Sequence, residues 1–270
     1  MATDNQRNAQ STTRVDQQCR YFSERQRRIY EYVRNHEPVA RERLVYRSDS
    51  VTDQRAAVHH CVALKRLGIL TADGNRLRIG FDVATLPDPE TVTARSVNGD
   101  VTIRPVGWRG YTDLCERLQQ NDGENPDVET EQISRRVATE GRLFRQDRVR
   151  ERVAYAAYTA TEMRGWVLLS SSRPQDKHTV TLTSGVVETS GGDVSLGSRL
   201  REYGLKWARS RGYGKVYRPL PATKQGTIET LESDGWTVDA RREGRYRTEA
   251  GLVDEVVLAW RFDDGFESDS

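Results

Sequence analysis

The chain contains little cysteine, and its three cysteines carry no metal-binding pattern. Cys19, Cys61 and Cys115 lie far apart, and no two of them have the Cys-x-x-Cys spacing of a zinc or redox motif. This scarcity excludes a small fold held together by disulfide bonds and indicates free thiols in a reducing compartment. The sequence therefore predicts no metal site.

Long apolar runs are missing as well. No stretch approaches the roughly 20 consecutive apolar residues that a membrane-spanning helix needs. The N-terminal segment MATDNQRNAQSTTR is polar and lacks the apolar core of a signal peptide. We therefore expect a cytoplasmic protein with no membrane partner.

An excess of charge of one sign is also absent. The 42 Lys and Arg residues and 40 Asp and Glu residues leave a formal net charge of +2, too small to imply a nucleic-acid partner by itself. At 270 residues the chain is long enough for two domains. Changes in composition predict a disordered tail, a small domain, a linker with two prolines, a larger domain and an acidic tail, at residues 1–20, 21–83, 84–99, 100–262 and 263–270.

Residues 21–83 are predicted to form three helices and a hairpin. Ser23 is a candidate N-cap for the first helix. The third helix is expected from about residue 50 to 67, with Val58, Val62 and Leu67 facing inward. Two short strands then flank the turn ADGN. This arrangement resembles a small winged helix-turn-helix domain.

Basic residues are concentrated in this first domain. From Arg20 to Ile79 there are 13 Lys and Arg residues against 7 Asp and Glu residues. In winged-helix domains the third helix lies in a major groove with the wing beside it, which implies contact with double-stranded DNA. The outward-facing candidates are Arg55, His59, Lys65, Arg66, Arg76 and Arg78. A winged helix that contacts protein, with its arginines solvated, is the alternative.

The most informative stretch, residues 178–236, predicts a strand, a glycine loop, a helix, a strand and a helix in that order. An alternating apolar run ends near Val187, a Gly/Ser loop follows, and a helix is expected from about Ser198. A second apolar run at 215–220 leads to a short helix that ends at Gly235. The free N–H groups at a helix start attract anions, and glycine lets a phosphate approach the backbone closely.

This stretch resembles the coenzyme-A-binding core of the GNAT acetyltransferase superfamily. The similar pieces are SGVVE, LGSRL, REYGLKWARSRGYGKVY and ATKQGTIETLESDGW, of which the last is similar to the family segment A-T-N-x-x-A-I-x-x-L-E-x-x-G-W. The resemblance covers residues 100–262 and implies an α/β (α+β) fold in which helices flank a mixed central sheet. It also implies N-acetyltransferase activity with acetyl-CoA as the cosubstrate, no metal, and an amine acceptor that it does not name.

The resemblance also implies which residues hold acetyl-CoA. Alignment on Gly197 gives the loop, the helix start and one residue before the last helix: Val186, Val187, Gly192, Asp193, Val194, Ser195, Leu196, Gly197, Ser198 and Lys224. Glu188, just beyond the strand, is the candidate general base for the amine. A solvated carboxylate with no catalytic role is its alternative.

Two functions are compatible with these residues. Ser195 stands at the first glycine of the family's phosphate loop, Lys224 where the family often has Asn, and Leu231 where many members have a proton-donating Tyr. These departures favour a DNA-binding regulator whose acetyltransferase-like domain has lost catalysis. The retained Gly197 and helix start favour an N-acetyltransferase fused to a winged helix, which is the function we predict. The motifs do not specify an oligomeric state.

Overall fold

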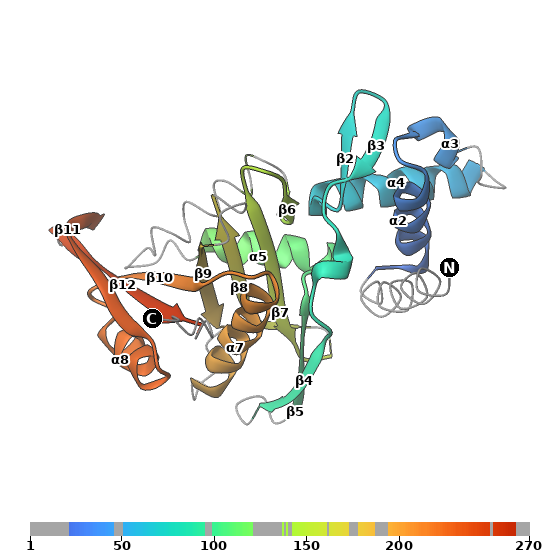
Figure 1. The fold of residues 1–270 in the computed structure, drawn as a ribbon. Coiled ribbons are helices and arrows are strands. Elements are labelled where there is room, and N and C mark those ends of the chain that lie inside the picture. Colours follow the sequence, from blue (N-terminus) through green and yellow to red (C-terminus); the bar gives the residue numbers. More distant parts are fainter. Residues whose placement is uncertain are drawn as a thin grey trace, which may run out of the picture.

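The computed structural model describes residues 22–45, 51–94, 99–120, 137, 139, 142–160, 162–172, 178–186, 194–248 and 251–262. Within these residues the chain forms an N-terminal unit of helices with a three-stranded sheet, followed by a nine-stranded sheet with flanking helices (Figure 1). The predicted mixed sheet flanked by helices is therefore confirmed. The sequence also predicts a helix from residue 128 to about residue 139, and this segment lies almost entirely outside the described residues.

The N-terminal unit alternates helices with short strands. Its elements are α2 (Glu24–His36), β1 (Val39–Ala40), α3 (Arg41–Val45), α4 (Val51–Leu67), β2 (Leu70–Asp73) and β3 (Arg76–Ile79), with the strands in the order β1-β3-β2. α2 begins where the sequence predicts, because Ser23 Oγ accepts a hydrogen bond from the Gln26 N–H at 3.2 Å. In return, Gln26 Oε1 accepts one from the Ser23 N–H at 3.0 Å, which completes a capping box.

The face that α4 buries matches the prediction at Leu67 but not at Val58 and Val62. Ala63, Leu64 and Leu67 are fully buried, whereas Val58 and Val62 are 50% and 43% exposed. The prediction for the two valines is wrong because α4 carries apolar residues on more than one side. Helical spacing alone therefore does not select the face that meets the core.

The nine-stranded sheet has the order β11-β12-β10-β9-β8-β7-β5-β4, with β6 paired beside β7. In the described part of the sheet, neighbouring strands are antiparallel except for β9 and β10, which are parallel. Its elements are β4 (Glu90–Ala94), β5 (Gly99–Pro105), α5 (Trp108–Gln120), β6 (Arg145–Gln146), β7 (Glu151–Tyr158), β8 (Met163–Ser171), β9 (Thr179–Val186), α7 (Val194–Ser210), β10 (Lys215–Pro221), α8 (Gln225–Ser233), β11 (Thr237–Thr248) and β12 (Gly251–Arg261).

Helices α7 and α5 cover opposite faces of this sheet (Figure 1). Gly204 lets α7 approach the strands closely, since a Cβ at this position would lie 3.1 Å from Leu169 Cδ1 and 3.3 Å from Leu182 Cδ1. On the other face, α5 buries Leu114 and Leu118. The central strands are therefore covered on both sides, and their ends are left to form sites.

The segment predicted as a linker, residues 84–99, contributes to the large sheet. A short helix, η2 (Val83–Thr85), is followed by β4, which pairs antiparallel with β5. The Tyr203 hydroxyl on α7 donates to the backbone oxygens of Pro87 and Asp88 at 3.2 and 2.8 Å. The linker assignment is therefore wrong for residues 90–94, because a five-residue strand beside two prolines has too weak a pattern to recognise without its partner strand.

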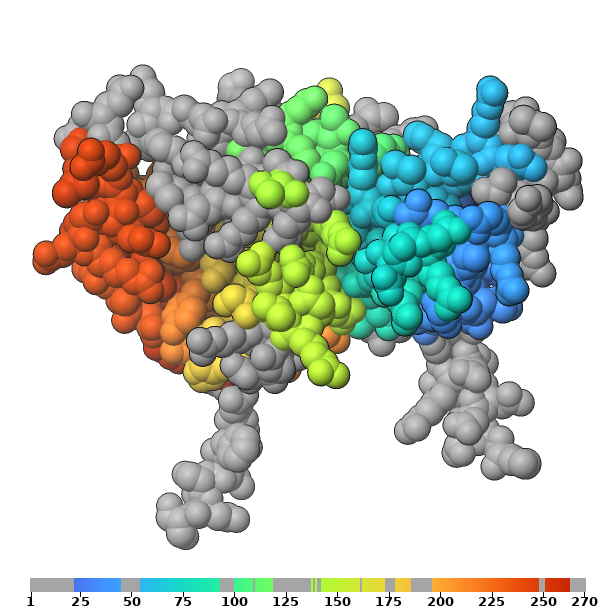
Figure 2. Space-filling view, turned by 90° about the horizontal axis from the view of Figure 1, so that it is seen from above, coloured from blue at the N-terminus to red at the C-terminus, as the bar shows by residue number. Residues whose placement is uncertain are grey.

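The N-terminal unit packs directly against the large sheet. The backbone N–H of Phe144 donates to Leu67 O at 2.7 Å, and the rings of Phe81 and Phe144 lie 5.2 Å apart between centroids. Buried side chains of both units form one contiguous cluster, and Figure 2 shows residues 22–83 in contact with the body of the molecule. Within the described ranges, no helix has the length and apolar character to span a membrane.

Candidate active site

Strands β9 and β10 separate along their length. Their parallel pairing consists of three residue pairs, Lys215↔Thr179, Val216↔Val180 and Tyr217↔Thr181. Beyond these, β9 continues to Val186 and stays paired with β8, while β10 continues to Pro221. We call the paired positions the closed end and the remainder, residues 182–186 and 218–221, the open end. Within the residues that the structure describes, β9 pairs at the open end only with β8, and β10 only with β12, so the open end is a gap in the strand pairing of the sheet.

The sequence of β10 explains why the pairing stops. The Lys215 N–H donates to the backbone oxygen of His178 at 3.0 Å, and every second residue of a strand directs its N–H to the same side. The backbone nitrogens of Tyr217, Pro219 and Pro221 therefore face β9. Because proline has no N–H, β10 cannot continue the ladder to β9 beyond Tyr217.

Arg218 reaches across the gap from β10. It is only 5% exposed, and its Nη2 donates to the backbone oxygen of Ser184 on β9 at 3.3 Å. A side chain thus occupies one backbone acceptor of the open end in place of a strand. The guanidinium also brings a positive charge into a site with little water, where electrostatic interactions are stronger than at the surface. Sequence reasoning missed Arg218, although an arginine inside the apolar strand KVYRPLP was the available signal.

Helix α7 begins earlier than predicted. It starts at Val194 instead of Ser198, so that Val194, Ser195 and Leu196 form its first turn and Gly197 follows inside the helix. Leu196 is 2% exposed and Leu200 is fully buried, and this apolar pair at i, i+4 extends the helix by one turn. The free N–H groups that favour an anion therefore belong to residues 194–196.

A polar cluster connects α7 to the end of α8. The Ser198 hydroxyl donates to Asp234 Oδ2 at 2.9 Å, and Arg201 Nη2 donates to the same carboxylate oxygen at 2.7 Å and to Ser198 Oγ at 2.8 Å. The side chain of Ser198, predicted to bind the cofactor, is therefore engaged within the protein. Arg201 is 8% exposed, and no sequence pattern indicates its burial.

The remaining predicted residues fall into two groups. Four lie outside the described residues, and their roles stay predictions: Val187, Glu188, Gly192 and Asp193. Val186 is the last residue of β9, and Lys224 is the exposed residue before α8, with no side-chain bond to that helix. Because β9 and β10 are parallel, Val186 and Lys224 both lie at the carboxyl ends of these strands.

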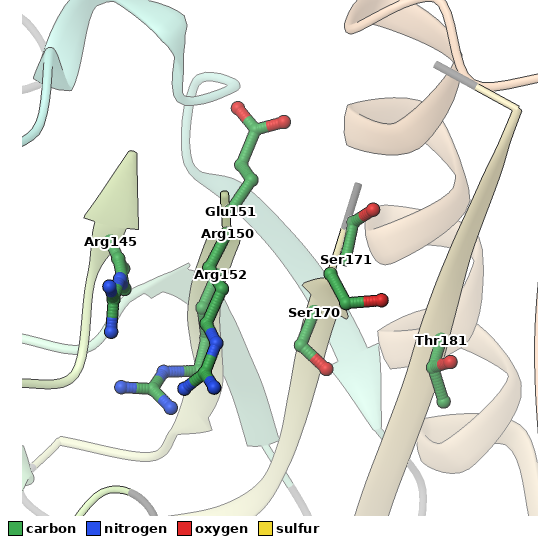
Figure 3. A pocket seen from close by; sticks show the side chains of 8 residues that line it. Arg145, Arg150, Glu151, Arg152, Ser170, Ser171 and Thr181 are labelled. Atoms are coloured by element: carbon green, nitrogen blue, oxygen red, sulfur yellow. The ribbon is translucent and has the colours of Figure 1, made fainter. Parts of the chain in front are cut away.

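A small pocket of about 110 Å³ borders the closed end (Figure 3). Its lining carries guanidinium and hydroxyl groups: Arg145, Arg150, Glu151, Arg152, Ser170, Ser171, Ser172 and Thr181. Thr181 is the last β9 residue paired with β10, so the pocket reaches the point where the strands separate. In Figure 3 the three guanidinium groups lie on one side, and the Glu151 carboxylate is directed away from them. The lining suits a polar or negatively charged group.

Glu151 holds the closed end together. It is 1% exposed, and its Oε1 accepts hydrogen bonds from Arg211 Nη2 at 2.7 Å and Nε at 3.0 Å. Its Oε2 accepts from the Tyr213 hydroxyl at 2.6 Å. Burial, and then the bond to Glu151, raises the pKa of the Tyr213 phenol, so this hydroxyl remains a donor. The network ties the start of β7 to the turn that precedes β10.

The residues predicted to contact DNA have two kinds of surroundings. Five are exposed: Arg55, His59, Arg66, Arg76 and Arg78. Two on α4 contact Trp108 of α5, with the His59 ring 6.4 Å from the indole ring and the Arg66 guanidinium 5.8 Å from it. Lys65 is partly buried, and this burial lowers its pKa. Part of α4 therefore faces the large unit, and DNA binding stays a prediction.

Cys61 and Cys115 are free thiols. Burial raises the pKa of the Cys61 thiol to about 11, so this thiol is protonated and weakly nucleophilic at neutral pH. Within the part of the chain that the structure describes, no three His, Cys, Asp or Glu side chains form a group that could hold a metal ion.

Comparison with known proteins finds similarity only among solved structures. No protein-family model matches the chain, and no curated protein sequence matches it. The GNAT-family acetyltransferase from Streptococcus pneumoniae is 15% identical, with 60% of this chain and 99% of that chain covered and a TM-score of 0.48. The ribosomal-protein-S18-alanine N-acetyltransferase from Escherichia coli is 18% identical, covering 62% and 97%, with a TM-score of 0.47. Arabidopsis thaliana NAA60 in complex with acetyl-CoA is 17% identical, covering 61% and 99%, with a TM-score of 0.46.

Proposed function

We propose that the protein is an acetyl-CoA-dependent N-acetyltransferase that transfers an acetyl group to an amine. The observation that carries this proposal is the separation of β9 from β10, followed in the chain by a glycine-containing loop and the start of α7. The motifs of residues 178–236 that resemble the GNAT superfamily fall on these same elements. The proposal therefore joins a sequence pattern to the place where the pairing of two strands stops.

The open end suits the pantetheine arm of acetyl-CoA. This arm contains two amide groups, which can pair with the unpaired edge of β9 as a neighbouring strand would. The described side chains in the first turn of α7 include no acidic residue, so its N–H groups and the positive end of its dipole favour the pyrophosphate. Residues 182–186 and 194–196 would therefore hold the two parts of the donor.

Amine acetylation also needs the amine deprotonated and the negative charge on the thioester stabilised. Glu188 stays our candidate for the base. Arg218 supplies a buried positive charge at the gap, where it favours the developing negative charge. Leu231 is fully buried in α8 and has no proton to give, so the leaving thiolate depends on another donor or on water.

The donor site is tested by titrating the full-length protein with acetyl-CoA in a calorimeter. Gly197→Asp places a carboxylate one residue beyond the first turn of α7, and we expect it to weaken binding at least tenfold by repulsion of the pyrophosphate. Gly226→Asp is the control for an added charge at a helix start, because it lies at an exposed position in the first turn of α8, where a Cβ meets nothing within 4 Å. Since Gly197 is buried, thermal unfolding of Gly197→Asp checks that this variant keeps its fold. No binding to the unaltered protein at millimolar acetyl-CoA, or equal binding by both variants, would contradict the proposal.

The role of Arg218 is tested by the rate of transfer. Arg218→Met removes the charge from the gap, and we expect kcat to fall about 100-fold, as for other groups that stabilise a transition-state charge. Arg218→Lys keeps the charge and should retain more of the rate. Release of the CoA thiol, followed with a panel of amines, measures both variants. A similar kcat for Arg218→Met and the unaltered protein would remove Arg218 from the mechanism.

We further propose that residues 22–83 form a winged-helix domain fused to the transferase. The support is the element order α2-β1-α3-α4-β2-β3, in which the β2–β3 hairpin stands where the wing of such a domain would be. Superposition of an experimental structure on winged-helix domains tests this assignment. A different path for β1 between α2 and α3 would overturn it.

A further inference from the structure

A second and larger pocket lies between the N-terminal unit and the large sheet. Its volume is about 730 Å³, within the range of pockets that bind small molecules. His59 and His60 of α4 line one side, and Arg104 of β5, the start of α5 and Tyr158 of β7 line the other. β7 and β8 lie between β5 and β9, so this pocket is separate from the open end of β9 and β10.

The first turn of α5 faces this pocket without a side-chain cap. The N–H of Tyr111 donates to Gly107 O at 3.0 Å, which makes Gly107 the residue before the helix, and glycine has no side chain to accept from the first N–H groups. Gly107, Trp108 and Gly110 all line the pocket. The free N–H groups and the positive end of the α5 dipole therefore border a cavity, an arrangement that favours a negatively charged group.

Tyr158 provides a second and independent indication. It is 7% exposed, lines the pocket, and its hydroxyl has no hydrogen-bond partner among the described residues. The hydroxyl lies against the first turn of α5, since a Cβ on Gly110 would be only 2.1 Å from its oxygen. Burial raises the pKa of the phenol to about 12, so Tyr158 carries a proton to donate at neutral pH. The Arg104 guanidinium lies 4.0 Å from the centre of the same ring.

Aromatic surface lies next to these polar groups. The indole of Trp108 stacks on Tyr111 with ring centroids 6.0 Å apart and planes 8° apart, and Phe22 lines the pocket on the opposite unit. Asp113, one turn further along α5, also lines the pocket. Its carboxylate repels anions, so it limits where a negatively charged group can lie and favours the first turn of α5.

We propose that this pocket binds a small organic anion, a carboxylate or phosphate attached to a planar apolar group. The anion lies at the first turn of α5 within reach of Tyr158 and Arg104, and the planar group lies against Trp108. Because residues of both units line the pocket, the bound molecule bridges the N-terminal unit and the large sheet. This site does not depend on the proposed acetyl transfer.

The test uses full-length protein labelled with 5-fluorotryptophan and observed by ¹⁹F NMR. The probes are benzoate, phenyl phosphate and the neutral benzyl alcohol, and loss of a signal in Trp108→Phe assigns the Trp108 resonance. We expect at least one of the two anions to shift this resonance saturably at millimolar concentration, and benzyl alcohol to leave it unchanged. A shift by benzoate alone identifies a carboxylate site, and a shift by phenyl phosphate alone identifies a phosphate site.

Two tyrosine variants separate this site from a general effect on the fold. Tyr158→Phe should weaken binding of the anion at least tenfold, because it removes a hydrogen bond to a charged group. Tyr155→Phe is the matched control: Tyr155 lies on the same strand and also has a buried hydroxyl without a partner in the described structure, but packs on Tyr203 away from the pocket. Asp113→Asn should strengthen binding.

Three results would overturn the proposal. The first is a Trp108 resonance that neither anion moves. The second is an equal shift with benzyl alcohol, which would indicate an apolar pocket with no preference for charge. The third is an equal loss of affinity in the Tyr158 and Tyr155 variants.

Discussion

The closed and open ends of the β9–β10 pair differ although the same two strands form both. At the closed end, three backbone pairs join the strands, and the buried Glu151 network lies beside them. At the open end, β10 keeps its pairs with β12 as far as Pro221↔Glu255 but has none with β9. The difference comes from backbone chemistry, because the two prolines of β10 direct their nitrogens to β9. A break in the pairing of two neighbouring strands can therefore be encoded by proline residues, which have no N–H to donate.

The largest effect on this comparison should come from the closed end. Glu151→Gln removes the charge that pairs with Arg211, and losing one partner of a buried pair costs about 3 kcal/mol of the free energy of unfolding. Urea unfolding measures the loss. Glu202→Gln is the control, since Glu202 pairs with Arg199 at 3.0 Å on the surface and should contribute less than about 0.5 kcal/mol. Similar losses in both variants would mean that the Glu151 network does not hold the closed end.

Restoring N–H groups to β10 should close the open end. In the double variant Pro219→Val, Pro221→Val, two new donors face β9, so we expect slow amide exchange at both positions and at least tenfold weaker binding of acetyl-CoA. The free energy of unfolding should change by less than about 1 kcal/mol, because new hydrogen bonds offset the lost rigidity of proline. Pro89→Val, at an exposed position outside the pair, is the control. Rapid exchange at residues 219 and 221 would show that something other than proline separates the strands.

Unfolding at alkaline pH tests whether water is excluded from the buried Tyr155 hydroxyl, on strand β7 of the same sheet. Burial, and then the neighbouring Tyr203 and Glu151, raises the pKa of Tyr155 well above its usual 10.0. The folded protein keeps this proton above pH 10 while the unfolded chain releases it, so the stability it contributes below pH 10 is lost as the pH rises. The loss is about 1.4 kcal/mol for each pH unit.

Tyr155→Phe should remove the part of the loss in the free energy of unfolding at alkaline pH that comes from Tyr155. Urea unfolding at pH 9 and pH 11 measures it, and the variant should lose about 1.4 kcal/mol less than the unaltered protein at pH 11. At neutral pH the two proteins should have similar stability, because the hydroxyl has no partner in the described structure. If the free energy of unfolding fell equally with pH in the variant and the unaltered protein, water would have to reach Tyr155 in the folded protein.

The smallest effect should come from one added methyl group at the open end. A Cβ on Gly185 would lie 2.9 Å from Trp166 Nε1, so Gly185→Ala forces the indole to move and should cost about 1 kcal/mol. Gly226→Ala should have the opposite sign, because its Cβ meets nothing within 4 Å and alanine favours the helix by about 1 kcal/mol. Thermal unfolding of both variants checks the signs. A higher unfolding temperature for Gly185→Ala would show that the open end can accommodate a methyl group beside Trp166 without displacing the indole.

The parts of this fold that the sequence predicts are those with local causes. The Ser23 cap depends on residues three apart, and the helix end at Gly235 depends on the positive φ of that glycine, 97°. The predicted order of strands and helices in residues 178–236 is also correct, because apolar residues repeat along each element with the spacing of a strand or of a helix. Such features need no knowledge of a distant partner.

The parts that the sequence does not predict depend on residues far away in the chain. β4 is stabilised by β5 and by Tyr203, and the face of α4 that is buried depends on the rest of the core. The candidate active site also combines features with local causes and features that depend on distant residues. The helix after the glycine loop follows from local glycine and apolar patterns, whereas the contact that Arg218 makes across the open end depends on Ser184, 34 residues earlier.

The open end also creates an edge strand in the interior of a sheet. An unpaired edge usually attracts another extended chain, and proteins protect their outer edges with charge, proline or short strands. Here the protection is on the facing strand, because Pro219 and Pro221 offer no donors and Arg218 already occupies the Ser184 carbonyl. A β-strand from another molecule that entered this gap could not form a continuous row of backbone hydrogen bonds with β10. The same residues that keep the gap open therefore also protect the folded chain from exchanging strands with its neighbours.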